Sequence, residues 1–279
     1  MKRTASLARI CLLVLLMTPL SLEAAWGNPD GTCANVEEIS DTSLSCTAGT
    51  TTVGFQTGSI IGVWLATDNV DTTDGQTSLH SSVTDTDGNT YTKACEYTNG
   101  EGAAAAGATV SFWFSSVLTA DLINPDTITI NTASAVTDKA MNTEEFTIAS
   151  GNVVSVEGAC QVLGNDNADA GSQTISGLTS QEYLFVRAIG TESNLALSLT
   201  ATASYTFVGS DGCSNTLSGG EATDIGECGE FRILTATGDT SDPTLLDTTN
   251  DNASVYLALK EAAPPAGPTG MPKRTIILP

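Results

Sequence analysis

The sequence predicts an all-β protein, an antiparallel β-sandwich with a jelly-roll-like arrangement of strands. Short runs rich in β-branched and aromatic residues recur between clusters of Gly, Asn, Asp and Ser. This spacing is typical of strands joined by turns and not of β-α-β units. The chain also lacks a long block of Glu, Lys, Leu and Arg that would favour a helix.

The expected strands follow one another through residues 49–261, and turn residues bound each of them. They lie at residues 51–55, 59–69, 80–85, 89–98, 108–118, 126–134, 144–151, 152–162, 172–178, 181–191, 196–208, 229–237 and 253–262. The run at 181–191 is the most continuously apolar, so we expect it in the centre of a sheet.

Residues 108–118 alternate between two faces, which indicates a half-buried antiparallel strand. One face carries a valine and two phenylalanines, and the other carries serines on both sides of Trp113. A tryptophan on an exposed face can stack on a sugar ring, so Trp113 is the candidate ligand-binding residue. The alternative, which we favour, is that Trp113 belongs to the core.

The two halves of the chain repeat one order of motifs. "SIIGVWLATDN" parallels "EYLFVRAIGTESN", "SFWFSSVLTADLINPDTI" parallels "EFRILTATGDTSDPTLL", and "EEFTIASG" parallels "ASVYLALKEA". Two intercalated halves fit one jelly-roll-like sandwich, and two tandem immunoglobulin-like sandwiches are the alternative. We favour one sandwich because no linker-like stretch separates residues 148 and 155.

These motifs also resemble a loosely defined protein family. An apolar strand, "TDTDGNTYT", an aromatic strand, "DTITI" and an "EEF" strand precede "EYLFVRAIG", "YTFVG", "EFRILTATGDTSDPT" and "ASVYLALKE". Over residues 50–261 this order resembles that of exported or phage virion-associated jelly-roll proteins. The resemblance implies a fold and a setting, and it assigns no catalytic residue. The export signal and the cysteines depart from the phage-borne members, which favours a secreted or cell-surface role.

Residues 1–25 have the pattern of an export signal, with a basic start, the apolar run "ICLLVLLMTPL" and cleavage expected near Ala24 and Ala25. Neither that run nor a later segment is long enough to span a membrane. We therefore expect a secreted or cell-surface protein. Residues 26–48 are interpreted as a disulfide-pinned N-terminal arm, and residues 262–279 as a disordered Pro/Gly-rich tail.

Six cysteines follow the export signal, and an exported chain is expected to pair them as disulfides. We favour the two pairs that close short loops, which leaves the third by elimination. The expected disulfides are Cys33–Cys46, Cys213–Cys228 and Cys95–Cys160. No C-x-x-C pair occurs and His80 is the single histidine, so we do not expect a structural zinc.

The chain carries 10 basic and 32 acidic residues, a net charge of −22. This excludes nucleic acid as a partner, because nucleic-acid binding needs a basic surface. One histidine, no G-x-S-x-G elbow and no phosphate-binding loop exclude the serine-triad and nucleotide-binding classes. Paired carboxylates, as in glycosidases, are the catalytic class that remains. The glutamates in or beside strands are Glu96, Glu144, Glu145, Glu182 and Glu230.

No cofactor is certain from the sequence, and Ca²⁺ is the one we consider, because several loops concentrate the oxygen ligands that it prefers. The candidate ligands are Asp68, Asp71 and Asp74 in one loop and Asn165, Asp166, Asn167 and Asp169 in another. The alternative is that these residues form Asx turns at strand ends. The stretch "DTDGN" at 85–89 is interpreted as the tight turn of a β-hairpin.

We therefore expect a non-catalytic extracellular binding or structural module of the cell-surface or adhesin type. Its partner would be a surface glycan or a protein. A phage virion decoration or tail component is the alternative, and a glycoside hydrolase with paired glutamates is a third candidate.

Overall fold

The structure is a computed structural model that describes residues 26–29, 31–49, 54–70, 73–103, 106–166, 168–193, 195–209, 212–217, 224–245 and 251–264. The expected export signal and residues 265–279 of the expected tail lie outside this part of the chain. The secondary structure described is entirely β. Within these ranges no helix is long and apolar enough to cross a membrane.

The first half of the chain forms one six-stranded sheet. Its strands are β1 (Thr32–Thr47), β2 (Ser59–Asp68), β3 (His80–Asp85), β4 (Tyr91–Ala103), β5 (Ala106–Ser115) and β6 (Thr127–Thr147). The second half forms the other six-stranded sheet. Its strands are β7 (Val153–Asn165), β8 (Gln173–Glu192), β10 (Thr206–Phe207), β11 (Cys213–Asn215), β12 (Ile225–Ser241) and β14 (Asn252–Ala262). The short strands β9 (Leu199–Thr200) and β13 (Thr244–Leu245) pair with each other.

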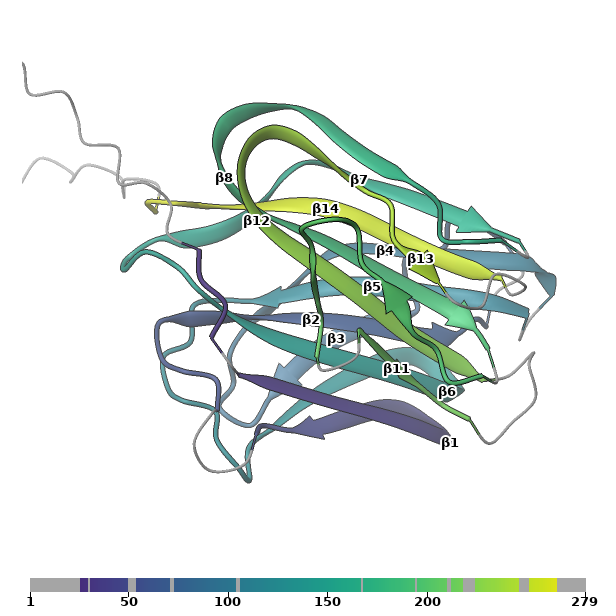
Figure 1. Ribbon diagram of the computed structural model, residues 1–279. Coiled ribbons are helices and arrows are strands. Elements are labelled where there is room, and N and C mark those ends of the chain that lie inside the picture. Colours follow the sequence, from purple (N-terminus) through teal and green to yellow (C-terminus); the bar gives the residue numbers. More distant parts are fainter. Residues whose placement is uncertain are drawn as a thin grey trace, which may run out of the picture.

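The two sheets pack face to face as one antiparallel β-sandwich (Figure 1), which confirms the expected fold class. The single sandwich, and not two tandem domains, is therefore the arrangement found. The expectation that the two halves intercalate is wrong, however, because each half supplies one whole sheet.

The two sheets share one strand order, which explains the repeated motifs. The first sheet runs β1-β6-β2-β5-β4, and the second runs β7-β14-β8-β12-β10. The packing between the sheets repeats in the same way. Strand β5 packs on β8 and β14, and its counterpart β12 packs on β2 and β6. Likewise β4 packs on β7 and β14, and β11, which pairs with β12 on the same side as β10, packs on β1 and β6. The two halves are thus related by an approximate two-fold axis.

Alternating side chains of both sheets fill the space between them. Trp64 on β2 is fully buried there, with its ring 4.8 Å from that of Phe112 on β5. Its indole N–H donates to the backbone carbonyl of Arg187 on β8 at 2.9 Å, which ties the sheets together. Gly190 lets β8 approach β2, because a Cβ there would lie 3.0 Å from that of Ala66.

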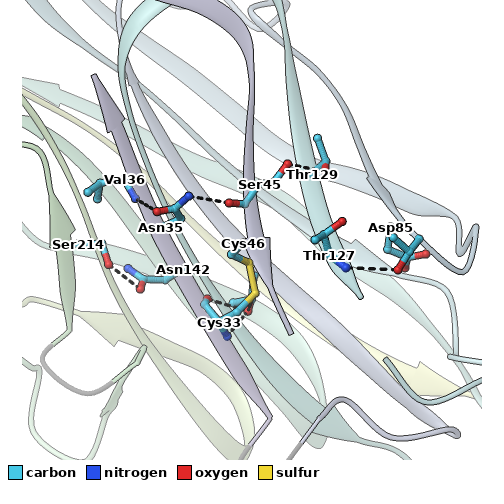
Figure 2. Close-up of a disulfide and its surroundings, with 12 residues drawn as sticks. Cys33, Asn35, Val36, Ser45, Cys46, Asp85, Thr127, Thr129, Asn142 and Ser214 are labelled. Atoms are coloured by element: carbon cyan, nitrogen blue, oxygen red, sulfur yellow. Dashed lines mark hydrogen bonds between the residues drawn. A yellow bond between two sulfur atoms is a disulfide. The ribbon is translucent and has the colours of Figure 1, made fainter. Parts of the chain in front are cut away.

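Residues 32–47, expected in an N-terminal arm, form edge strand β1 along the whole of β6. The pairing shifts around Asp41, so the β1–β6 ribbon bends. This bend brings Cys33 and Cys46, at opposite ends of β1, into a disulfide (Figure 2). A second apolar cluster, which includes Leu44, Ile61 and Trp113, fills the outer face of the first sheet.

The other two disulfides also form the pairs that the sequence favours. Cys95 on β4 is bonded to Cys160 on β7, so this bond joins the two sheets along one edge of the sandwich. Cys213 on β11 is bonded to Cys228 on β12 within the second sheet. Three disulfides in one chain indicate an oxidising environment.

Candidate functional site

Trp113 lies in a hydrophobic core cluster, in agreement with the favoured interpretation. It is 5% exposed and belongs to the apolar cluster on the outer face of the first sheet. Its indole N–H donates to the Ser111 hydroxyl at 2.9 Å. Residues of β1, β3 and β6 cover this face, so the ring is not available to stack on a sugar.

The glutamates considered for glycoside hydrolysis anchor loops. Each accepts a hydrogen bond from the backbone N–H of a residue outside its own strand. The pairs are Glu96 with Leu79, Glu144 with Gly209, Glu145 with Gln56, Glu182 with Trp26 and Glu230 with Thr202. Charge-assisted bonds of this kind are among the stronger ones in proteins, so these carboxylates hold loops against the sheets.

Glu230 has the most complete set of partners. Besides the Thr202 backbone, it accepts hydrogen bonds from the hydroxyls of Thr202 and Ser241 at 2.7 and 2.8 Å. Burial raises its pKa, and these bonds together with the nearby Arg187 guanidinium lower it. Arg187 itself is fully buried and donates to the carbonyls of Ala170 and Gly171. The group holds the loops against the outer face of the second sheet.

Most of the candidate calcium ligands cap loops instead of meeting at one point. Asp74 accepts from the backbone N–H of Gly100, and Asp166 accepts from the Asn99 side chain. Asp169 accepts from the backbone N–H groups of Ala170 and Leu245. Asn165 donates its side-chain amide to the Asp169 carbonyl. Most of these contacts join distant segments, so they are not the local Asx turns of the alternative interpretation. Asp71 and Asn167 lie outside the described residues.

The stretch "DTDGN" forms a tight turn but not a hairpin. Asp85 accepts hydrogen bonds from the backbone N–H groups of Asp87 and Asn89, and Gly88 has a φ of +76°. The strands on either side do not pair with each other, because β3 pairs with β6 and β4 pairs with β5. The turn therefore crosses between two parts of the first sheet.

A cluster that the sequence did not indicate lies beside Asp68. Carboxylate oxygens of Glu38 on β1, Asp138 on β6 and Asp224, just before β12, all lie within 4.8 Å of one another. We call these three residues the carboxylate triad. Asp138 and Asp224 are buried and Glu38 is exposed, so the triad opens to solvent on one side.

Asp68 faces the triad because of the strand register. Ala66 pairs with Ala140 and Thr67 with Lys139, which places Asp68 across from Asp138 at the end of the β2–β6 ladder. Ala66 and Ala140 belong to the core between the sheets, and residues two positions along a strand share a face. Both aspartates therefore point into the end of the space between the sheets.

Burial and like charge raise the pKa values of both aspartates. The pKa of Asp68 rises to about 7, mainly because it is buried and secondly because Asp138 is near. The pKa of Asp138 rises to about 6, through burial and then through Asp224, while a hydrogen bond with Thr216 opposes the rise. Oxygen ligands, a net negative charge and one open side are the features of a site for a hard cation.

Sequence reasoning identified Asp68 but missed the triad, because its members come from three distant segments. Asp138 lies between the expected strands at 126–134 and 144–151, so the sequence did not mark it, and only the structure places it in a strand whose neighbouring positions are buried. A charged residue on a buried face needs a partner or a function.

A second group of buried polar residues links the two sheets. Asn142 on β6 donates its side-chain amide to Glu227 on β12 and accepts from the Ser214 hydroxyl on β11 at 2.8 Å (Figure 2). Glu227 is fully buried, and burial raises its pKa to about 8, partly offset by the Asn142 bond. Burial therefore favours the neutral carboxylic acid near pH 7.

Comparison with protein-family models, curated proteins and solved structures found no match.

Proposed function

We propose that the protein is an exported, non-catalytic binding or structural module. The observation that supports this proposal is the use of the strand glutamates. All five that could serve a hydrolase accept backbone N–H groups of loops. Carboxylates used in this way stabilise a scaffold, whereas a glycosidase needs two of them facing one cleft.

The two edge strands β1 and β7 support a binding role. Among the described strands, β1 pairs only with β6 and β7 pairs only with β14. Both present apolar side chains to solvent, with Ile39 on β1 62% exposed and Val162 on β7 46% exposed. A long edge with exposed apolar residues suits a partner protein that adds a strand to the sheet.

The catalytic alternative is tested by measuring reducing-sugar release from a panel of polysaccharides. We compare the exported chain with Glu182→Ala and Glu230→Ala variants, and with Glu157→Ala, which removes a half-buried ion pair to Lys260. We expect no turnover in any of the proteins. Turnover that is lost in Glu182→Ala or Glu230→Ala and kept in Glu157→Ala would overturn the proposal.

The binding role is tested by titrating labelled protein onto cells of the producing organism, before and after enzymatic removal of surface glycans. We expect saturable binding that survives deglycosylation and weakens in the Ile39→Lys and Val162→Lys variants. Both substitutions are on exposed positions of edge strands, so the fold should be retained. Binding that deglycosylation removes would identify a glycan partner instead, and the absence of saturable binding would refute a binding role on these cells.

A further inference from the structure

The carboxylate triad lies where the two sheets meet without a covalent link. Strands β4 and β7 form one edge of the sandwich, which the Cys95–Cys160 disulfide closes. At the opposite edge β11 packs on β1 and β6. Glu38 and Asp138 approach this edge from the first sheet, and Asp224 approaches it from the second.

We propose that one Ca²⁺ ion binds at this edge and ties the two sheets together through the carboxylates of Glu38, Asp138 and Asp224, with the buried carboxylate of Asp68 nearby. The site is independent of the function proposed above, because it concerns how the scaffold is closed and not which partner it meets.

The spacing of the triad suits this ion. Ca²⁺ lies about 2.3–2.6 Å from its oxygen ligands, so two ligands on opposite sides of it are about 4.6–5.2 Å apart. The triad oxygens all lie within 4.8 Å of one another, so one ion can touch all three. Carboxylates are hard ligands, and the exposed side at Glu38 leaves room for the waters that complete six to eight ligands.

Asp68 is the second observation that points to a ligand. The residue is 8% exposed, and its Oδ1 atom is fully buried with no hydrogen-bond partner among the described residues. A buried carboxylate oxygen without a partner loses its hydration without compensation. A cation beside Asp138 would supply that compensation, because continuing the β2–β6 register puts Asp68 opposite Asp138.

Lys139 offsets the negative charge of the cluster only in part. Lys139 follows Asp138 on β6 and points to the opposite face of the strand. Its ammonium group donates to the carbonyls of Ile39 and Val136 at 2.7 and 2.9 Å. It also forms ion pairs with Glu37 and Asp41. The four carboxylates at the edge therefore repel one another, and a divalent cation would offset that repulsion.

The site is tested by calorimetric titration of CaCl₂ into the metal-stripped chain, together with thermal unfolding in Ca²⁺ or EDTA. We expect saturable binding of one ion. At a Ca²⁺ concentration about 100 times the Kd, the melting temperature should rise by roughly 5–10 °C.

Two variants and a matched control separate a specific site from general screening of acidic charge. Asp138→Asn should abolish saturable binding while leaving the melting temperature in EDTA unchanged or higher, because it removes a like charge. Glu38→Gln, at an exposed position, keeps the test available if Asp138→Asn does not fold, and it should weaken binding at least tenfold. Asp87→Asn makes the same charge change in a solvent-exposed turn and should bind like the unaltered chain. The absence of saturable binding, or an equal response of the three variants, would overturn the proposal.

Discussion

Glu227 should make the protein less stable as the pH rises through neutrality. Its carboxyl group lies between the sheets, is fully buried and is held by Asn142. Burial raises its pKa from 4.5 to about 8 in the folded protein, and the unfolded chain has the ordinary value. Between pH 4.5 and pH 8 the folded state binds more protons than the unfolded state. The contribution of Glu227 to the free energy of unfolding is therefore complete below pH 4.5 and declines as the pH rises through 8.

The size of the effect follows from the two pKa values. One pH unit corresponds to about 1.4 kcal/mol for a group that is protonated in the folded state and ionised in the unfolded state. From pH 5 to pH 7 the Glu227 contribution should therefore fall by about 2–3 kcal/mol, and from pH 5 to pH 9 by about 4 kcal/mol. The Glu227→Gln variant is neutral throughout and should lack this decline.

The assay is urea unfolding of both proteins in EDTA at pH 5, 6, 7, 8 and 9. The readout is the difference between their free energies of unfolding. That difference cancels other titrating groups, such as His80, whose pKa burial lowers to about 4 and which destabilises the fold as the pH drops. The variant should gain about 2–3 kcal/mol relative to the unaltered chain between pH 5 and pH 7. Parallel curves would show that Glu227 is not held as a neutral acid.

Two further predictions concern the scaffold. Replacing Cys95 and Cys160 with alanine should lower the free energy of unfolding by about 4 kcal/mol, because that disulfide closes a loop of 65 residues. Replacing Cys213 and Cys228 should lower it by about 3 kcal/mol, because their loop has 15 residues. Urea unfolding of the two double variants checks this order, and the reverse order would contradict the loop-length argument. Glu230→Ala should lower the free energy of unfolding by about 3–5 kcal/mol, because it removes a nearby negative charge from buried Arg187. In the same assay Glu157→Ala should lower it by less than about 1 kcal/mol. Equal losses would show that Glu230 does not anchor its loop.

The sequence predicts the fold class, the disulfides and the internal repeat because these depend on local patterns. Alternation around Phe112 marks a strand, and Cys213 and Cys228 are close along the chain. The distribution of the halves between the sheets depends on long-range packing, which no local pattern encodes. The same limit applies to the burial of Trp113. The alternation places Trp113 on the opposite face of its strand from Phe112, but it does not show that other strands also cover this outer face.

The candidate site was less predictable than the fold for a related reason. Loop composition favours aspartates such as Asp74 and Asp169, but composition cannot distinguish a cation ligand from a loop cap. The triad is assembled by the bend of the β1–β6 ribbon and by the packing of β11 on that ribbon. Of the four carboxylates at this edge, the sequence predicted only Asp68 as a candidate cation ligand. Its place beside the triad follows from the strand register, which continues to Asp68 opposite Asp138.

The approximate two-fold axis explains why the triad lies where it does. The β4–β7 edge and the β11–β1 edge are counterparts, and a disulfide joins the sheets at the first of them. At the second edge Cys213 bonds within its own sheet, so this edge is held by non-covalent contacts. The contacts described there include Ser214 with Asn142 and the Leu217 backbone N–H with Glu38. An edge with four carboxylates and no covalent link should be the first part of the sandwich to open in the absence of metal. A bound cation would supply at this edge the cross-link that the disulfide supplies at the other.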